Sequence, residues 1–435
     1  MFLIKLFTAG IGTLYIIEVS LFAFGTLGAF NVPFLKDYFT LQPVVKRLMY
    51  YEFLISTATE LSLQLIVTKV IIIQLVKLFG GFNYMLCCIM YYVDICTLFG
   101  LVRLFYEMLK EKRIVEEFIL SHYNLDVNEL QRFINWNLFI CLINPLWTPS
   151  NITIHPNITY ATTEEIRETL NATDQDYDQP RKHTLNIITA TRPTPGHLKP
   201  VLIHIHGGAW RAGKKDIFYP YQKILVSEED WIVVNVGYRL ASKSPYPASL
   251  IDVKRAIRWV RENIFWFGGN ASCIVLAGDS AGGHLAAVAC LTANDPRYQP
   301  GFEDVVTSVQ AVISLNGALD ITSKYSVANF FSESVAHHLT ADMDFLHQHS
   351  PASLIKDTHI DVPFLCIAGA RDNIIESYMA ANFMTAHKSS EKSQKCKLVE
   401  FPAGHHISYI TWSPRSLFTA RVIQAWCREL YPKIC

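Results

Sequence analysis

A serine lies between two glycines in the segment from Gly278 to Gly283 (GDSAGG), which has the G-x-S-x-G pattern of a nucleophilic serine. The apolar, β-rich segment CIVLA precedes it and the helix-like segment HLAAVACLT follows it. At such a strand-to-helix turn, side chains at Gly278 and Gly282 would collide with neighbouring backbone, and the helix N-terminus favours developing negative charge. We therefore predict that Ser280 is a catalytic nucleophile. The alternative is a glycine-rich turn with an incidental serine.

A second glycine-rich segment, His206-Gly207-Gly208-Ala209-Trp210, follows the apolar segment VLIHI. Two glycines let the chain bend so that backbone N–H groups point at a substrate oxygen. We expect the N–H groups of Gly207, Gly208 and Ala281 to form an oxyanion hole, with His206 supporting the loop. The segment resembles the HGG loop of lipases and esterases.

Together the two motifs resemble those of α/β-hydrolase-fold serine esterases. The similarity is to the hormone-sensitive-lipase-like group and its relatives, including prenylcysteine methylesterases and kynurenine formamidases. Tyr238-Arg239-Leu240-Ala241, with Pro247 and Asp252, looks like the segment that those proteins carry between loop and elbow. This chain has Ala209 where many lipases have a third glycine, and this difference affects the size of substrate that is expected. The resemblance extends from His206 to the C-terminus.

The resemblance implies a triad in the chain order nucleophile, acid, histidine. Asp372 follows the apolar segment FLCIA and is the predicted acid, with Asp320 as an alternative that also follows a β-rich segment. Two histidines, His405 and His406, compete for the third position. The relatives' G-x-H form favours His406, because Gly404 stands two residues before it. His406 would act as general base and acid, oriented by the aspartate.

Strand-like and helix-like segments alternate in the second half of the chain, which predicts an α/β fold with a mostly parallel sheet and helices on both faces. Catalytic residues are then expected just after strands. The predicted strands are 184–189, 201–205, 231–236, 274–277, 309–315, 364–368 and 397–401. The predicted helices are 249–263, 281–292, 377–387 and 414–431.

The first quarter of the chain is apolar, because only 13 of the 76 charged residues precede residue 110. Three apolar runs, about 6–30, 53–76 and 84–105, each have the length of a membrane-spanning helix. We therefore predict a transmembrane helical region over 1–109, a linker with interfacial helices over 110–150, and an α/β-hydrolase catalytic domain over 151–435. Lys69 and Asp94 are expected to pair between the helices. The alternative is a buried helical hairpin in a soluble core.

The predicted function is that of a membrane-anchored serine hydrolase that cleaves small-molecule or lipid carboxylic esters, in the endoplasmic reticulum or another internal membrane. An amidase or formamidase with the same triad and a non-catalytic scaffold or adhesion protein are the alternatives. Balanced charge, 38 basic and 38 acidic residues, gives no attraction to nucleic acid. No cofactor or metal is expected, since the histidines at 337–349 lack regular ligand spacing.

Basic residues in the first loop favour a cytoplasmic hydrolase domain. If the first or the second apolar run does not span, the alternative is a luminal glycoprotein, with acceptor sequons at Asn151, Asn157, Asn171 and Asn270.

Overall fold

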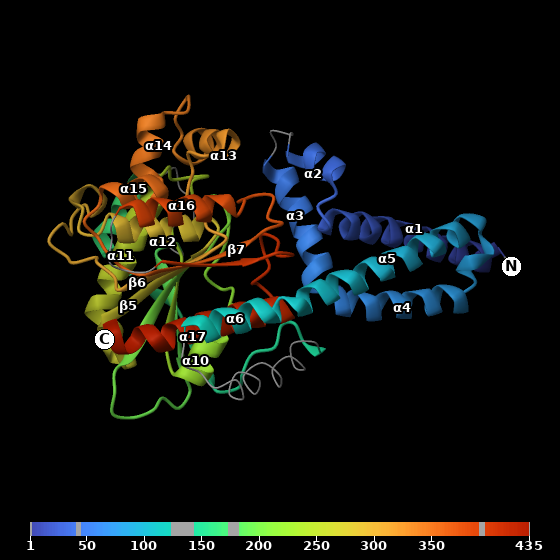
Figure 1. Cartoon of the computed structure of the whole chain (residues 1–435), viewed down its shortest axis with the longest axis horizontal. Helices are drawn as coiled ribbons and strands as arrows, with labels where there is room; N and C mark the ends of the chain where they lie inside the picture. The colour runs from blue at the N-terminus through green and yellow to red at the C-terminus, as the bar shows by residue number, and fades with distance from the viewer. Residues whose placement is uncertain (1, 41–44, 123–142, 173–181, 391–395, 435) are drawn as a thin grey trace. The chain divides into compact units, whose positions relative to one another are not determined.

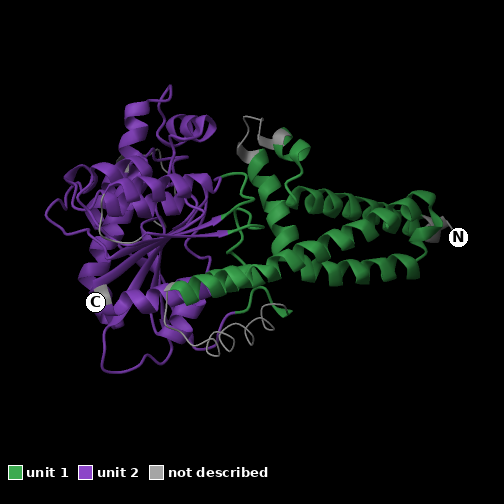
Figure 2. Cartoon of the chain, in the orientation of Figure 1, with its two compact units in different colours: residues 1–147, 369–374, 401–419 green, residues 148–368, 375–400, 420–435 purple. Residues whose placement is uncertain are grey.

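The structure is a computed structural model that describes residues 2–40, 45–122, 143–172, 182–390 and 396–434. Two compact units divide the chain (Figure 2). Unit 1 holds residues 1–147, 369–374 and 401–419, and unit 2 holds 148–368, 375–400 and 420–435. The chain first passes from unit 1 to unit 2 after Trp147. Two short segments predicted as parts of that domain, 369–374 and 401–419, group instead with the N-terminal helices.

Unit 1 is built from helices in which α1, α3, α4 and α5 pack against one another (Figure 1). Its core lies where small and apolar side chains of α1, α3 and α5 meet, among them Ala29, Ile55 and Leu101. The helices are α1 (Phe2–Ala29), α2 (Pro33–Thr40), α3 (Val45–Glu60), α4 (Ser62–Leu78), α5 (Met85–Lys110) and α6 (Lys112–His122), with a 3-10 turn η1 (Gly81–Asn83) before α5.

Two stretches of unit 1, Leu6–Ala29 and Met85–Ser121, are long and apolar enough to cross a membrane. The expected second span is instead two helices, α3 and α4, that meet at an 84° bend and reach the required length only together. The bend follows a polar stretch at the end of α3 (Ser56–Glu60, STATE), which favours internal partners over lipid. Of the predicted linker, residues 123–142 lie outside the described residues, including most of the expected interfacial helix.

The expected pairing of Lys69 with Asp94 is confirmed. Lys69 Nζ lies 2.5 Å from Asp94 Oδ1 and 3.0 Å from Glu18 Oε1. The hydroxyl of Tyr15 donates to Asp94 Oδ2 at 3.0 Å. Charged groups in an apolar helical bundle are stabilised when they pair in this way. Large apolar side chains of α1, α4 and α5 are exposed instead, for example Leu14, Leu78 and Phe99.

Unit 2 carries an eight-stranded sheet in the order β1-β2-β4-β3-β5-β6-β7-β8. β2 pairs antiparallel with β1 and β4, and the strands from β4 to β7 pair in parallel. Central strands such as β3 are buried along almost their whole length, as expected where helices cover both faces. The strands are β1 (Ile152–Thr159), β2 (Thr184–Ala190), β3 (Lys199–Ile205), β4 (Ile232–Val236), β5 (Gly269–Asp279), β6 (Ala311–Leu315), β7 (Phe364–Gly369) and β8 (Lys397–Phe401).

Helices cover both sides of this sheet (Figure 1). α12 packs on β3, β5 and β6 beside α11 and α15, whereas α10 packs against β1, β2 and β4. The α-helices are α8 (Thr163–Ala172), α10 (Pro220–Glu229), α11 (Ala248–Asn263), α12 (Ala281–Leu291), α13 (Tyr325–Asn329), α14 (Met343–His349), α15 (Pro351–Asp357), α16 (Tyr378–Ser389) and α17 (Pro414–Ile434). Shorter turns are η2 (Ile264–Phe267), η3 (Pro296–Tyr298) and a π-helical turn η4 (Phe330–Val335).

Seven of the eight strands of this sheet were predicted from the sequence, and β1 was not. That strand lies at the sheet edge, contains Pro156 and has a break in register between His155 and Ile158. Proline is confined to edges and bulges of sheets because it cannot donate to the ladder. The α/β-hydrolase architecture is therefore the one expected, with one additional edge strand.

Candidate active site

Ser280 lies at the turn between β5 and α12 and has a backbone φ of 53°. This left-handed conformation is strained for a residue with a side chain. Its N–H donates to Leu315 O at 2.9 Å, and its own carbonyl accepts from the N–H of His284 in α12. The flanking glycines are required sterically, since a Cβ on Gly278 would lie 2.2 Å from Gly282 O and one on Gly282 would lie 2.0 Å from Ile205 O. The geometry is that of a nucleophile elbow.

The loop after β3 bends through three residues with positive φ, namely Gly208, Ala209 and Trp210. A Cβ on Gly208 would lie 2.3 Å from Ala212 O, so this position requires glycine. The N–H of Gly207, expected in the oxyanion hole, instead donates to Asp279 Oδ1 at 3.0 Å. This amide is therefore not available to a substrate oxygen, which corrects the predicted role of Gly207.

His206 contacts this loop and the neighbouring Tyr238. Its Nδ1 hydrogen-bonds to Gly207 O at 2.8 Å, and its ring stacks on Tyr238 with centroids 4.4 Å apart. The Tyr238 hydroxyl in turn donates to His206 O at 2.8 Å. Burial lowers the pKa of His206 to about 4, so the ring is neutral at pH 7.

Asp279, directly before the serine, is a buried carboxylate that sequence reasoning did not single out. Its Oδ1 also accepts from the Tyr219 hydroxyl at 3.1 Å and lies 3.3 Å from His204 Nε2. Burial alone would raise its pKa, but His204, His206 and Tyr219 hold the pKa of this carboxyl below its usual range. One ionised side chain therefore ties the elbow to the loop that follows β3.

A hydrogen bond of 2.6 Å joins His406 Nδ1 to Asp372 Oδ2 within unit 1. Both side chains are buried, and Asp372 Oδ1 also accepts from the N–H of Ile374 at 2.8 Å. The two loops touch directly, because the N–H of Arg371 donates to Gly404 O at 2.9 Å and a Cβ on Gly369 would lie 2.4 Å from Gly404 O. Asp372 and His406 therefore form a buried acid–imidazole pair carried by two loops in contact.

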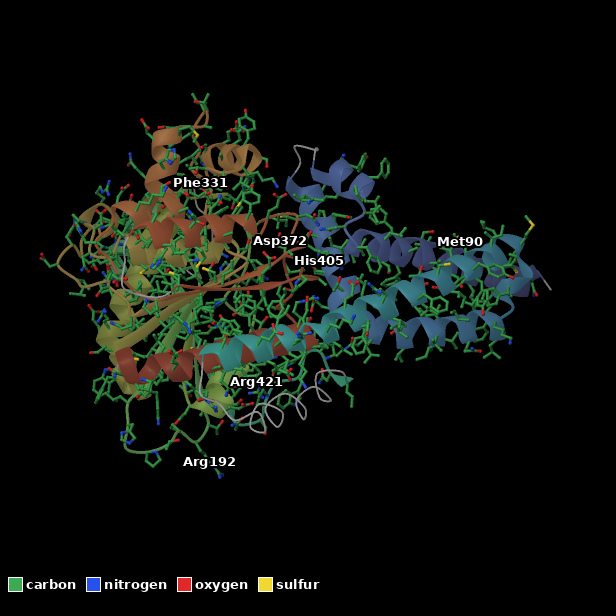
Figure 3. The ribbon with its side chains drawn as sticks, in the orientation of Figure 1. Met90, Arg192, Phe331, Asp372, His405 and Arg421 are labelled. Carbon is green, nitrogen blue, oxygen red and sulfur yellow. The ribbon has the colours of Figure 1, made fainter. Side chains whose placement is uncertain are left out.

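His405 and Asp320, the alternatives for the histidine and the acid of the triad, have other partners. His405, labelled with Asp372 in Figure 3, hydrogen-bonds through Nε2 to Ala29 O at 3.0 Å. Asp320 accepts from Thr322 Oγ1 and from Asn382 Nδ2, each at 2.8 Å, as a turn-stabilising residue does. The pairing of Asp372 thus favours His406 over His405, and Asp372 over Asp320.

An aromatic and histidine cluster lies beside the elbow in unit 2. Trp210 Nε1 donates to His284 Nδ1 at 3.3 Å, and His284 Nε2 hydrogen-bonds to His349 O at 2.9 Å. Burial lowers the pKa of His284 to about 3, so this ring is neutral at pH 7 and is hydrogen-bonded at both of its nitrogens. Phe331, labelled in Figure 3, packs against Trp210 with centroids 5.1 Å apart. Within the described ranges, no group of three or more His, Cys, Asp or Glu residues has the arrangement of a metal site.

A parallel sheet with a serine elbow, a glycine-rich loop after β3 and an acid–imidazole pair after β7 and β8 defines the α/β-hydrolase class. Residues 188–386 match the BD-FAE family model. The chain is 34% identical to esterase LipQ of Mycobacterium tuberculosis over 255 residues, which are 58% of this chain and 60% of that protein. It is also 34% identical to the probable carboxylic ester hydrolase LipM of the same organism, over 53% of this chain and 54% of that protein.

The fold is likewise similar to that of a solved structure, esterase B from Lactobacillus rhamnosis. That match has a TM-score of 0.53 and 18% identity, and it covers 74% of this chain and 97% of that one. Over the residues that these comparisons cover, the chain is thus similar to α/β-hydrolase esterases. It spans somewhat more than half the length of these two curated relatives.

Proposed function

We propose that this chain is a membrane-anchored serine carboxylesterase with Ser280 as nucleophile, His406 as general base and Asp372 as the acid that orients it. The strained elbow at Ser280 is the observation that carries the proposal, because strain at a strand-to-helix turn of this kind serves to present a hydroxyl. Each of the three residues follows a strand of one sheet, β5, β7 or β8. The esterase relatives support the same reaction.

In the proposed reaction the Ser280 oxygen attacks the ester carbonyl carbon while His406 Nε2 takes the hydroxyl proton. The tetrahedral intermediate collapses, the alkoxide leaves with that proton as an alcohol, and an acyl-serine remains. Water then attacks the acyl carbon, gives its proton to His406, and the carboxylic acid leaves as Ser280 regains the proton. Asp372 holds the imidazole by its Nδ1 and stabilises the imidazolium.

Backbone amides stabilise the negative oxygen of the intermediate. With the Gly207 amide bonded to Asp279, the next two amides of the loop, Gly208 and Ala209, become the donors, together with the amide of Ala281 at the start of α12. Losing one donor of this kind typically costs roughly 100- to 1000-fold in rate. Ala209 can serve in place of a third glycine because a backbone amide does not depend on the side chain.

Membrane anchoring through α1, α5 and the bent pair α3–α4 is supported by their length and by the apolar side chains that they expose. An anchored esterase meets substrates that partition into lipid, so the proposed substrates are apolar or lipid esters. An internal membrane such as the endoplasmic reticulum is the proposed location. Membrane fractions should retain the full chain after washing with alkaline carbonate, and release into the supernatant would remove the anchoring claim.

Hydrolysis assays on the detergent-solubilised full chain test the reaction. We expect turnover of p-nitrophenyl esters by the wild type and none by Ser280→Ala. A formanilide in the same assay separates the alternatives, because an amidase would cleave it at least as fast as the matched ester. No hydrolysis of either substrate by well-folded wild type would favour the scaffold function.

A further inference from the structure

Glu52 is a buried carboxylate in the middle of α3, with 1% of its surface exposed. An ionisable group in an apolar helix is costly unless polar partners surround it. Its partners come from the two segments that carry the acid–imidazole pair. The backbone N–H of His406 donates to Glu52 Oε1 at 2.8 Å, and Asn373 Nδ2 donates to Glu52 Oε2 at 3.0 Å.

The two contacts bracket the acid–imidazole pair. Asn373 directly follows Asp372, while the other contact is to the backbone of the histidine itself. Each carboxylate oxygen of Glu52 therefore holds one of the two loops, and the 2.6 Å bond between Asp372 and His406 depends on the relative position of those loops. A side chain that fixes both loops fixes that distance.

Other residues of the helical segments hold the same loops at a greater distance from the pair. The N–H of Ala403 donates to Glu111 Oε1 at 2.9 Å, and the fully buried Arg415 pairs with both Glu111 and Glu60. The Arg371 guanidinium pairs with Glu107 at 2.9 Å. Among these carboxylates of the described helices, Glu52 alone contacts His406.

We propose that Glu52 is a positioning residue for catalysis, so that the N-terminal helices complete the active site rather than only anchor it. The inference rests on the proposed triad. Besides orientation, Glu52 contributes negative charge where an imidazolium forms during proton transfer. Glu52 Oε1 also lies 3.5 Å from His405 Nδ1. Other charged groups near the two histidines are Asp372, bonded to His406, and Glu60, which acts on His405 and is itself paired with Arg415.

The test compares Glu52→Gln, Glu52→Ala and Glu52→Asp in the full chain with a matched control, Glu18→Gln. Glu18 is a partly buried carboxylate of α1 that pairs with Lys69, within the helices and away from the loops. We expect kcat to fall roughly tenfold in Glu52→Gln and roughly 100-fold in Glu52→Ala, the size of effect that a misplaced catalytic group produces, with KM little changed. Glu52→Asp should recover part of the loss, and Glu18→Gln should stay within about twofold of wild type.

Two further readouts separate positioning from folding. Removing the negative charge in Glu52→Gln should move the acid limb of the kcat/KM profile to lower pH, which simple destabilisation would not do. If Glu52→Ala does not fold, Asn373→Ala removes the same contact from the loop side and should lower kcat while KM stays unchanged. Folded Glu52→Gln or Asn373→Ala with wild-type kcat and an unmoved acid limb would overturn the inference. The proposed function fails separately, if the wild type itself is inactive or Ser280→Ala is active.

Discussion

The N–H of Gly207 donates a hydrogen bond of 3.0 Å to Oδ1 of Asp279, across 72 residues of sequence. The donor lies at the start of the loop after β3, and the acceptor directly precedes Ser280. The proposed oxyanion donors and the proposed nucleophile are thus held in register by one buried carboxylate, which also accepts from Tyr219. This link gives Asp279 a testable role.

Replacing Asp279 by alanine should reduce both stability and turnover. The change leaves the Gly207 N–H and the Tyr219 hydroxyl without their acceptor, at a cost of about 1–3 kcal/mol for each buried group. We expect kcat/KM per folded molecule to fall at least tenfold. Asp320→Ala is the control, because Asp320 stabilises a turn through Thr322 and Asn382. This variant should be less stable than the wild type but should keep its turnover. Equal loss of turnover in the two variants would contradict the assignment.

The adjacent histidines make a matched pair for the second prediction. His406→Gln removes the proposed base and should lower kcat by roughly 1000-fold or more, because a triad without its base retains only binding and oxyanion stabilisation. His405→Gln removes the contact of Nε2 with Ala29 O and that of Nδ1 with Glu52 Oε1, 3.5 Å away, but leaves the His406 N–H bonded to Glu52. It should lower the melting temperature while kcat falls less than tenfold. Steady-state kinetics and thermal unfolding on the same preparations check both. The assignment would be reversed if His405→Gln were the inactive variant.

Much of this site can be predicted from local sequence. The remaining features depend on contacts between residues far apart in the chain. The elbow and the loop after β3 are recognisable because glycine is needed where a Cβ would meet backbone, as at Gly278 and Gly208. The pairing of Lys69 with Asp94 follows from two charges at similar depth in apolar runs. Glu52, by contrast, binds partners 321 and 354 residues away, and only its isolation as a charge in an apolar stretch could have drawn attention to it.

The role of Gly207 could not be read from its motif for a related reason. Spacing shows that a glycine-rich loop can expose amides, but which amide is already occupied depends on Asp279, which a different strand supplies. The edge strand β1 was missed because Pro156 lies inside it. Local pattern therefore predicted most strands and the turn that carries Ser280, whereas tertiary contacts determine which neighbours support that turn.

Acid should destabilise unit 2, because two of its histidines are buried as neutral rings. The pKa of His206 is lowered to about 4 and that of His284 to about 3, so between these values and about pH 6.5 the unfolded chain binds protons that the folded chain does not. The contribution of these histidines to the free energy of unfolding is therefore fully present above about pH 6.5 and is lost as the pH falls. At pH 5 each histidine has lowered the free energy of unfolding by about 2 kcal/mol.

Thermal unfolding of detergent-solubilised protein between about pH 5 and pH 7.5 measures this slope. His284→Gln keeps a donor and an acceptor for His349 O and Trp210 but cannot titrate, so its melting temperature should vary less with pH than that of the wild type. His347→Gln is the control, since this ring is exposed and its hydrogen bond in the described part of the chain is to the Ser353 hydroxyl. An unchanged slope in His284→Gln would exclude His284 as the source.

The buried ion cluster of Lys69, Glu18 and Asp94 predicts that folding lost by removing one charge is restored by removing all three. Lys69→Met leaves the carboxylates of Glu18 and Asp94 without their cation, and breaking a buried pair in this way costs about 3–5 kcal/mol. The amount of folded protein recovered from membranes should fall sharply. The triple variant Lys69→Met/Glu18→Gln/Asp94→Asn removes all three charges and should restore it. Failure of the triple variant to recover, with Lys69→Met itself well folded, would show that the cluster does not stabilise the helices.

Reaction with a fluorophosphonate probe, followed by mass-spectrometric mapping of the labelled residue, tests the central claim most directly. The probe forms a covalent bond only with an activated serine, so no substrate needs to be known. The account predicts that membranes carrying the wild-type chain are labelled at Ser280, that Ser280→Ala is not labelled, and that His406→Gln is labelled far more slowly. Folded wild type without label, or label that persists in Ser280→Ala, would contradict it.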